Sequence, residues 1–340
     1  MARWKLGVVA AAVLFCQVGV FYLQALRCQF HQQPVEASAD ADLRVLIVSD
    51  VHILGKRRRT WPERVWVDWQ VHWSARAAVD VHKPDVALVL GDQFDEGTRW
   101  TPDSDWEVGN HDTSFGREMR LEDVKRYEVT FGPSNRIDMI GGHAFVSLNS
   151  MALDSDVANK AVKAEARSVD FAELRAQTNG SVILLTHLPL FRIDDLQCGE
   201  ERLREAGHIT YEHPGFQYET HHHVLSRKLS AELLAKVRPD LVLSGHTHAW
   251  CAYQHPDAAA MEYTIPTFSW GQRPDPSYAL LRLRRPNAVQ LEVEAPVVTA
   301  CHLPRESLIF TIYAVTAAVV GLVPILRRLL TARTAKTKGA

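Results

Sequence analysis

LRVLIVSDVH, residues 43–52, is the stretch that decides the fold class of this chain. Its first part, Leu43 to Val48, is mostly apolar and β-branched, which is typical of a buried strand. The strand runs directly into a polar turn. Similar runs recur at residues 86–90, 144–148, 182–185 and 241–243, and amphipathic patterns with helical spacing lie at residues 61–73 and 224–237. Strands that alternate with helices predict a layered α/β fold.

Polar motifs follow most of these predicted strands. Four motifs directly follow a predicted strand: SDVH at 49–52, GDQFD at 91–95, TH at 186–187 and SGHTH at 244–248. A fifth motif, GNHD at 109–112, comes a short segment after GDQFD. Binding sites in open α/β sheets form beyond the carboxyl ends of the strands, so we expect these motifs to converge. Each motif alone is weak, because a lone histidine at a strand end is more often a satisfied polar group than a ligand. The occurrence of all five motifs in this order is well above what chance would produce.

The side chains in these motifs are suited to a pair of divalent cations. Carboxylate, imidazole and amide oxygen are ligands for Mn²⁺, Fe or Zn²⁺. A carboxylate can bridge two cations about 3.5–4 Å apart, and such pairs clamp a displacement at phosphorus. The motifs contain no thiol, which argues against a structural zinc site. The sequence therefore predicts a two-metal phosphoesterase.

Both ends of the chain carry apolar segments without charged residues. Residues 6–26 and 307–326 are each about long enough to span a bilayer as a helix. A signal peptide is the alternative for the first segment, but its apolar stretch is longer than usual. Positive residues precede the first segment and follow the second, which predicts cytoplasmic termini. The expected order is a span, a linker at 27–42, a lumenal α/β domain at 43–300, a second span and a cytoplasmic tail at 327–340.

Charge and cysteine content add two expectations. The 38 Lys and Arg residues balance 40 Asp and Glu residues, which argues against a nucleic-acid partner. A lumenal domain permits disulfides, and Cys198 with Cys251 is the pair we expect, with free buried thiols as the alternative.

The ordered motifs resemble the calcineurin-like metallophosphoesterase superfamily over about residues 43–270. The resemblance implies a sandwich of two mixed β-sheets flanked by helices, and a cofactor of two divalent cations, with Mn²⁺ favoured over Fe or Zn²⁺. It implies that His111 protonates the leaving oxygen or stabilises the transition state, and that Asp112 orients His111. It also implies seven metal ligands: Asp50, His52 and His248 for one cation, Asn110, His187 and His246 for the other, and Asp92 as the bridge between them.

Finer features resemble the metallophosphoesterase 1 family. These are GDQFDEG at 91–97, THLPLFR at 186–192, Phe268-Ser-Trp270, the paired spans and the lysine-bearing tail. The resemblance implies a phosphodiesterase that removes ethanolamine phosphate from a mannose of glycosylphosphatidylinositol (GPI) anchors and so aids transport of GPI-anchored proteins. It places the enzyme at endoplasmic reticulum exit sites, in the intermediate compartment or in Golgi membranes. The tail KTKGA, residues 336–340, matches a retrieval signal that coat proteins bind, and an ordinary positive flank of a membrane helix is the alternative.

One departure from the family pattern opens other functions. Only 11 residues, Thr98 to Val108, separate Gly97 from Gly109, where the family places a helix and a strand. A parallel crossover needs about a dozen residues or more. One alternative is therefore a catalytically inactive binding form in which Asn110 and His111 are displaced. A membrane-bound phosphomonoesterase that has the same metal centre but another substrate is a separate alternative.

Overall fold

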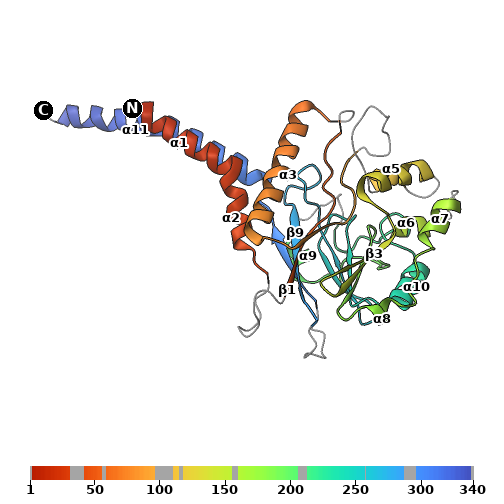
Figure 1. The fold of residues 1–340 in the computed structure, drawn as a ribbon. Helices are drawn as coiled ribbons and strands as arrows, with labels where there is room; N and C mark the ends of the chain where they lie inside the picture. Colours follow the sequence, from red (N-terminus) through yellow and green to blue (C-terminus); the bar gives the residue numbers. More distant parts are fainter. Residues whose placement is uncertain are drawn as a thin grey trace.

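The computed structural model describes residues 2–30, 42–55, 59–95, 110–114, 118–154, 160–205, 213–256, 258–286 and 296–337. Most of the expected linker at 27–42, the whole of 98–108 and the last three residues of the tail lie outside the described residues. The α/β domain and the two terminal helices are described almost throughout (Figure 1).

The described strands form two mixed sheets, as the resemblance implied. The first sheet has the order β10-β9-β1-β2, in which β1 runs parallel to β2 and antiparallel to β9. The second has the order β3-β4-β5-β6-β8-β7, with parallel pairing from β4 to β8 and an antiparallel strand at each edge. The strands are β1 (Asp42–Val48), β2 (Val86–Val89), β3 (Arg136–Ile140), β4 (His143–Ser147), β5 (Val182–Leu185), β6 (Leu241–Ser244), β7 (Cys251–Gln254), β8 (Met261–Thr264), β9 (Ser277–Arg284) and β10 (Val297–His302).

Helices cover the outer faces of the two sheets (Figure 1). The long helix α3 packs on the first sheet, where Ala78 joins Leu46 and Leu280 in one apolar cluster. The helices α5, α7 and α10 pack on the second sheet. The helices of the domain are α3 (Trp61–His82), α4 (Asn110–Thr113), α5 (Leu121–Phe131), α6 (Ser150–Asp154), α7 (Lys160–Ala166), α8 (Leu174–Gln177), α9 (Glu200–Arg204) and α10 (Arg227–Val237).

The main apolar core lies between the two sheets. Val45 and Ile47 of β1 meet Phe145, Ile183 and Leu243 of the second sheet, and all five side chains are almost fully buried. Removal of this apolar surface from water, about 25 cal/mol for each Å², holds the sheets face to face. The parallel strands β1, β2, β5 and β6 can therefore present their carboxyl ends to one another.

The predicted start of α3 is confirmed, whereas α10 begins later than predicted. Thr60 and Glu63 form a capping box, in which the Thr60 N–H donates to Glu63 Oε2 at 2.8 Å. The predicted helix at 224–237 begins at Arg227, because the Ser226 hydroxyl accepts the Leu229 N–H at 3.2 Å and caps the helix there.

The two apolar ends form helices that are long and apolar enough to cross a membrane, over Arg3–Arg27 and Glu306–Ile325. The first comprises α1 (Ala2–Leu14), a π-helical turn η1 (Phe15–Gly19) and α2 (Val20–Arg27), and the second is part of α11 (Glu306–Thr337). Figure 1 shows α1 and α11 side by side, projecting from the domain with both termini at one end, while α2 bends and runs along α3.

Two disulfides stabilise the chain. Cys198–Cys251 is the pair that the sequence predicted. Cys28–Cys301, which was not predicted, joins the residue after α2 to β10 across 273 positions of sequence. Cys16 in η1 is the fifth cysteine and is free and buried.

Candidate metal centre

Six of the predicted ligands lie together at the carboxyl ends of four strands. Asp50 and His52 follow β1, Asp92 follows β2, His187 follows β5, and His246 and His248 follow β6. Backbone hydrogen bonds connect these turns. The His52 N–H donates to Asp92 O at 3.0 Å, and the Gly245 N–H donates to His187 O at 2.9 Å. The strand ends therefore converge on one site, as expected.

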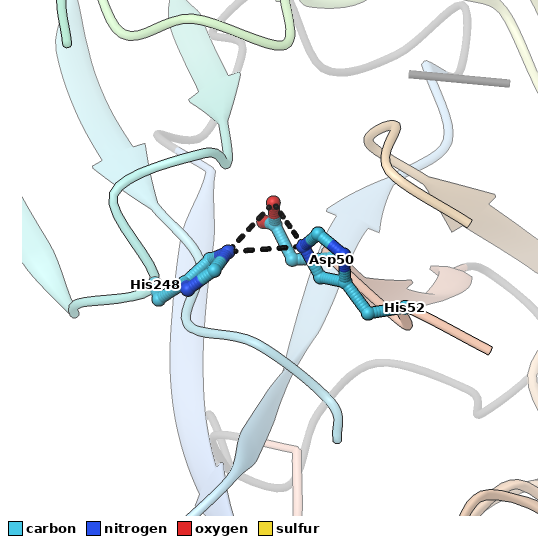
Figure 2. A group of neighbouring side chains, drawn as sticks. All are labelled: Asp50, His52 and His248. Atoms are coloured by element: carbon cyan, nitrogen blue, oxygen red, sulfur yellow. Dashed lines mark hydrogen bonds and ion pairs between the residues drawn. The ribbon is translucent and has the colours of Figure 1, made fainter. Parts of the chain in front are cut away.

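One group of donors consists of Asp50, His52 and His248 (Figure 2). The Nε2 atoms of the two histidines lie 3.1 Å apart, and Asp50 Oδ1 lies 3.4 Å from His248 Nε2 and 3.8 Å from His52 Nε2. Asp50 Oδ2 is held by the Ser49 hydroxyl at 2.5 Å and the His246 N–H at 2.9 Å. Asp50 Oδ1 is buried and has no hydrogen-bond partner among the described residues, so it is the oxygen left to bind a cation.

A second group consists of Asp92, His187 and His246. Asp92 Oδ1 lies 3.3 Å from His187 Nε2, and the rings of His187 and His246 are 5.1 Å apart. Asp92 Oδ2 also lies 3.6 Å from His52 Nε2, a member of the first group. The Asp92 carboxylate therefore lies between the two groups, where a bridging ligand must lie.

The second nitrogens of two of the predicted ligand histidines, His187 and His246, are held by neighbouring acceptors. His187 Nδ1 donates to Leu90 O at 2.8 Å, and His246 Nε2 donates to His222 O at 2.6 Å. These contacts leave His187 Nε2 and His246 Nδ1 as the ligand atoms. Such contacts orient metal-binding imidazoles and raise their basicity.

The backbone is strained at the ligands. Asp50, His52, Asp92, His246 and His248 all have φ between 44° and 71°, a region that side chains other than glycine rarely adopt. Each such residue costs on the order of 1 kcal/mol or more, and strain of this kind collects at functional sites. The site also needs two close backbone approaches. A Cβ atom at Gly91 would lie 2.5 Å from His187 Nδ1, and one at Gly245 would lie 2.7 Å from Asp50 Oδ2.

Asn110, His111 and Asp112 of the GNHD motif form the start of α4. His111 lies at the site, where its N–H donates to Asp92 Oδ1 at 3.2 Å and its Nδ1 donates to Asp95 O at 2.9 Å. The short segment at residues 98–108 had suggested that His111 is displaced from the site, and this displacement is not observed. The side chain of Asn110 lies outside the description, so its role as a ligand stays a prediction. Asp112 is fully buried, and its orienting role also stays a prediction.

Sequence reasoning missed the residues that support the ligands. Asp95 Oδ1 lies 3.6 Å from His52 Nδ1 and accepts the Gln272 amide at 3.2 Å. Arg273 Nη1 donates to His248 O at 3.2 Å. The second aspartate of GDQFD was a visible signal for Asp95. Gln272 and Arg273 have no local signal, because they reach the site only through the tertiary fold.

Charge interactions fix the protonation of the ligands in the metal-free protein. Burial lowers the pKa of His187, but the adjacent Asp92 carboxylate outweighs burial and raises it to about 10. Burial raises the pKa of Asp50, but His248 outweighs that and lowers it to about 2. Burial also lowers the pKa of His246 to about 3. The carboxylates are thus ionised and His246 is neutral at pH 7, while His187 holds a proton that a cation must displace.

Metal affinity is expected to rise with pH. Because the pKa of His187 lies above neutral pH in the metal-free protein, binding of a cation at His187 releases one proton. The apparent affinity should therefore increase about tenfold for each pH unit between pH 6 and 8. Calorimetry with Mn²⁺ in buffers of different ionisation enthalpy measures the proton release. A pH-independent affinity with no released proton would contradict this assignment.

Comparison with known proteins gives consistent matches. Residues 43–250 match the sequence pattern of the calcineurin-like phosphoesterases. Metallophosphoesterase 1 of Ailuropoda melanoleuca is 30% identical over 349 residues, covering 91% of this chain and 85% of that protein. Metallophosphoesterase 1 of Danio rerio is 28% identical over 352 residues, covering 92% and 88%. Both alignments are longer than the 340 residues of this chain, so these relatives carry residues that it lacks.

Proposed function

Because the chain belongs to the calcineurin-like phosphoesterase family and is a metal-dependent phosphoric ester hydrolase, we propose that it is a two-metal phosphodiesterase that removes ethanolamine phosphate from a mannose of GPI anchors. The observation that carries the two-metal part is the position of Asp92, whose two carboxylate oxygens lie 3.3 Å from His187 and 3.6 Å from His52. One carboxylate in contact with both donor groups is the arrangement that a pair of cations needs.

The residues of the site have separable roles in this reaction. Bound divalent cations, which we propose to be Mn²⁺, polarise the phosphoryl group and lower the pKa of water at the site. Water then adds to phosphorus, and the bond between phosphorus and the mannose oxygen breaks. That oxygen must gain a proton. Since His111 Nδ1 is engaged by Asp95 O, His111 Nε2 is the nitrogen that can deliver the proton.

A cavity beside the site supports a sugar-linked substrate. It has a volume of about 270 Å³, and His187 forms part of its wall. The rest of the wall is mixed: apolar residues such as Leu90, Phe145 and Leu185 form about half of it, and hydroxyl and amide groups in the other half can pair with the hydroxyls of a glycan. The buried Ser150 hydroxyl has no partner among the described residues and is available for such a contact. The other polar members of the wall include Gln93, Thr113, Tyr127, Ser134 and Asn149.

The terminal helices and disulfides support a membrane enzyme of the early secretory pathway. Two helices able to span a membrane lie side by side with both termini at one end (Figure 1). Disulfides such as Cys28–Cys301 persist in oxidising compartments, which supports a lumenal domain. We propose that GPI-anchored proteins are the substrates and that the C-terminal lysines bind coat proteins, which places the enzyme between exit sites and the Golgi.

Purified full-length protein loaded with Mn²⁺ tests this proposal. Release of ethanolamine phosphate from a GPI glycan is expected at a rate at least about tenfold above that for a phosphomonoester such as p-nitrophenyl phosphate, because the polar groups of the cavity wall can pair with the glycan. Faster hydrolysis of the monoester would favour the alternative of a membrane-bound phosphomonoesterase. Fewer than two bound cations per chain, with no hydrolysis of either substrate, would favour the inactive binding form.

A further inference from the structure

The helix α3 lies on the side of the domain from which α1 and α11 project (Figure 1). Its inner face, including Val67, Ser74 and Ala78, is buried against the domain. Its outer face is exposed and begins with two apolar residues, Trp61 at 69% and Val65 at 47% exposure. No packing within the described domain accounts for apolar residues of this size on the outer face.

Between these two faces, a stripe of tryptophans contacts the terminal helices. Trp66 stacks on Phe310 of α11 at 5.6 Å and on Trp270 at 5.4 Å, and Trp69 meets Phe21 of α2 edge-on at 5.3 Å. The indole N–H groups find polar partners, since Trp66 donates to Glu306 at 2.8 Å. Aromatic side chains with an apolar ring and a polar tip are enriched where a membrane meets water.

The bend in the first apolar segment fixes the level of α3 relative to a membrane. The Trp69 indole donates to Gln17 O in the π-helical turn at 3.2 Å, so α3 crosses the segment near residue 17. Residues beyond Gly19 belong to α2, which packs on α3 and is not free to enter lipid. The part that projects, residues 2–19, is about 27 Å long at 1.5 Å per residue. This length matches the roughly 30 Å hydrocarbon core of a bilayer, so α3 lies at its boundary.

We propose that the outer face of α3, led by Trp61 and Val65, lies in the headgroup layer of the membrane and seats the domain on the bilayer. The inference rests on the membrane anchoring in the proposed function. A lipid surface is the occupant because the face is continuous with the two projecting helices. The face continues with the polar residues Asp68, His72 and Arg76 and then the apolar Val79, which is 46% exposed, and this mixture of apolar and polar side chains is compatible with a headgroup layer rather than with a dry protein interface.

This seating orients the metal centre through a short run of hydrogen bonds. Gln70 of α3 donates to Phe268 O at 3.0 Å and accepts the Trp270 N–H at 2.9 Å. In the same loop, the Phe268 N–H donates to Ser49 O at 2.9 Å and the Thr267 hydroxyl donates to the carbonyl of the ligand Asp50 at 2.5 Å. The distance and angle between the site and the membrane are therefore set by α3, which suits a substrate that is itself held in the bilayer.

Fluorescence quenching in vesicles tests the position of α3. Full-length Cys16→Ser protein carrying Val65→Cys is labelled with an environment-sensitive fluorophore and reconstituted in phosphatidylcholine vesicles that contain a nitroxide on the headgroup. Strong quenching and a blue-shifted emission are expected for the probe at residue 65. The matched control is Val129→Cys on α5, which is 89% exposed and for which no quenching is expected. Equal quenching at residues 65 and 129 would overturn the inference.

A third labelled position separates this inference from its premise. Val9→Cys in α1 is expected to be quenched by a nitroxide on the acyl chain, because α1 projects from the domain into the bilayer. Quenching at residue 9 without quenching at residue 65 would refute the seating of α3 alone. No quenching at residue 9 would refute the anchoring and the inference together. Neither result bears on the metal chemistry, which the glycan assay measures.

Activity provides a second readout of the same surface. The double variant Trp61→Glu and Val65→Glu is expected to hydrolyse a phosphodiester carried on a vesicle lipid about tenfold more slowly, because the charged face no longer enters the headgroup layer. Its hydrolysis of a soluble diester such as bis(p-nitrophenyl) phosphate should match the unmodified protein. Equal loss of activity on both substrates would indicate damage to the fold. In that case the quenching of the probe at residue 65, in a chain without the glutamate substitutions, decides whether α3 lies in the headgroup layer.

Discussion

Replacing Asp92 by asparagine is expected to abolish phosphodiester hydrolysis, with a loss of about a thousandfold or more. The Asp92 carboxylate contacts His187 of one donor group and His52 of the other. The asparagine side chain keeps the shape but has one carboxylate oxygen fewer and no charge, so it cannot bridge two cations. Turnover of a phosphodiester with Mn²⁺ and the number of bound cations, measured by elemental analysis, check this result.

The control for Asp92 is Asp170→Asn, which alters an exposed aspartate whose Oδ1 accepts the Ala172 N–H at 2.9 Å. This variant should keep two cations per chain and normal turnover. Undiminished turnover in Asp92→Asn, in protein that melts as a folded domain, would refute the bridging assignment. A drop in bound metal from two cations to one or none is the expected cause of the loss.

Loss of the Cys198–Cys251 disulfide is expected to lower the stability of the α/β domain substantially. A crosslink across 53 residues removes disorder from the unfolded chain, so replacing both cysteines by serine should lower the free energy of unfolding by about 4 kcal/mol. The bond also fixes a buried ionic cluster, because Cys198 lies beside Asp195, which pairs with Arg192 and Arg202 at 2.9 and 2.8 Å. Denaturant unfolding in detergent measures the change.

The matched control for the disulfide is Cys16→Ser, which removes the free thiol of η1 and should leave the free energy of unfolding close to that of the unmodified protein. If the double serine variant unfolded at the same denaturant concentration as the Cys16 variant, the crosslink would have no stabilising role. A double serine variant at Cys28 and Cys301 measures separately how much the Cys28–Cys301 disulfide contributes to the free energy of unfolding.

Most of the parallel strands of the fold were predictable, with β8 as the exception, whereas most antiparallel strands were not. Strands such as β1 and β5 are buried on both faces, so they are short runs of Val, Leu and Ile that stand out in sequence. β9 inserts between β1 and β10, and its sequence SYALLRLR mixes arginine with leucine. No local pattern shows that such a segment pairs with a strand more than 200 residues earlier.

The convergence of six predicted metal ligands could be foreseen because these residues sit at the ends of recognisable strands. Their supports could not be foreseen, because Arg273 and His222 act through contacts with His248 and His246 that only the tertiary fold creates. The bend at η1 within the first apolar segment could not be predicted from the sequence for the same reason. Residues 6–26 read as one apolar run, and the run divides at η1 because the tryptophans of α3 bind its second half.

The Cys28–Cys301 disulfide and the β1–β9 pairing together set an order of assembly. β1 is made early, yet its neighbour β9 and the cysteine that crosslinks residue 28 are among the last parts of the domain to be synthesised. Such distant pairings fold slowly. Cys28 must therefore keep a free thiol until almost the whole domain has been synthesised. The crosslink holds the end of α2 close to the start of α11, so both terminal helices leave the domain at one place, and a chain that stops before residue 301 cannot form this bond.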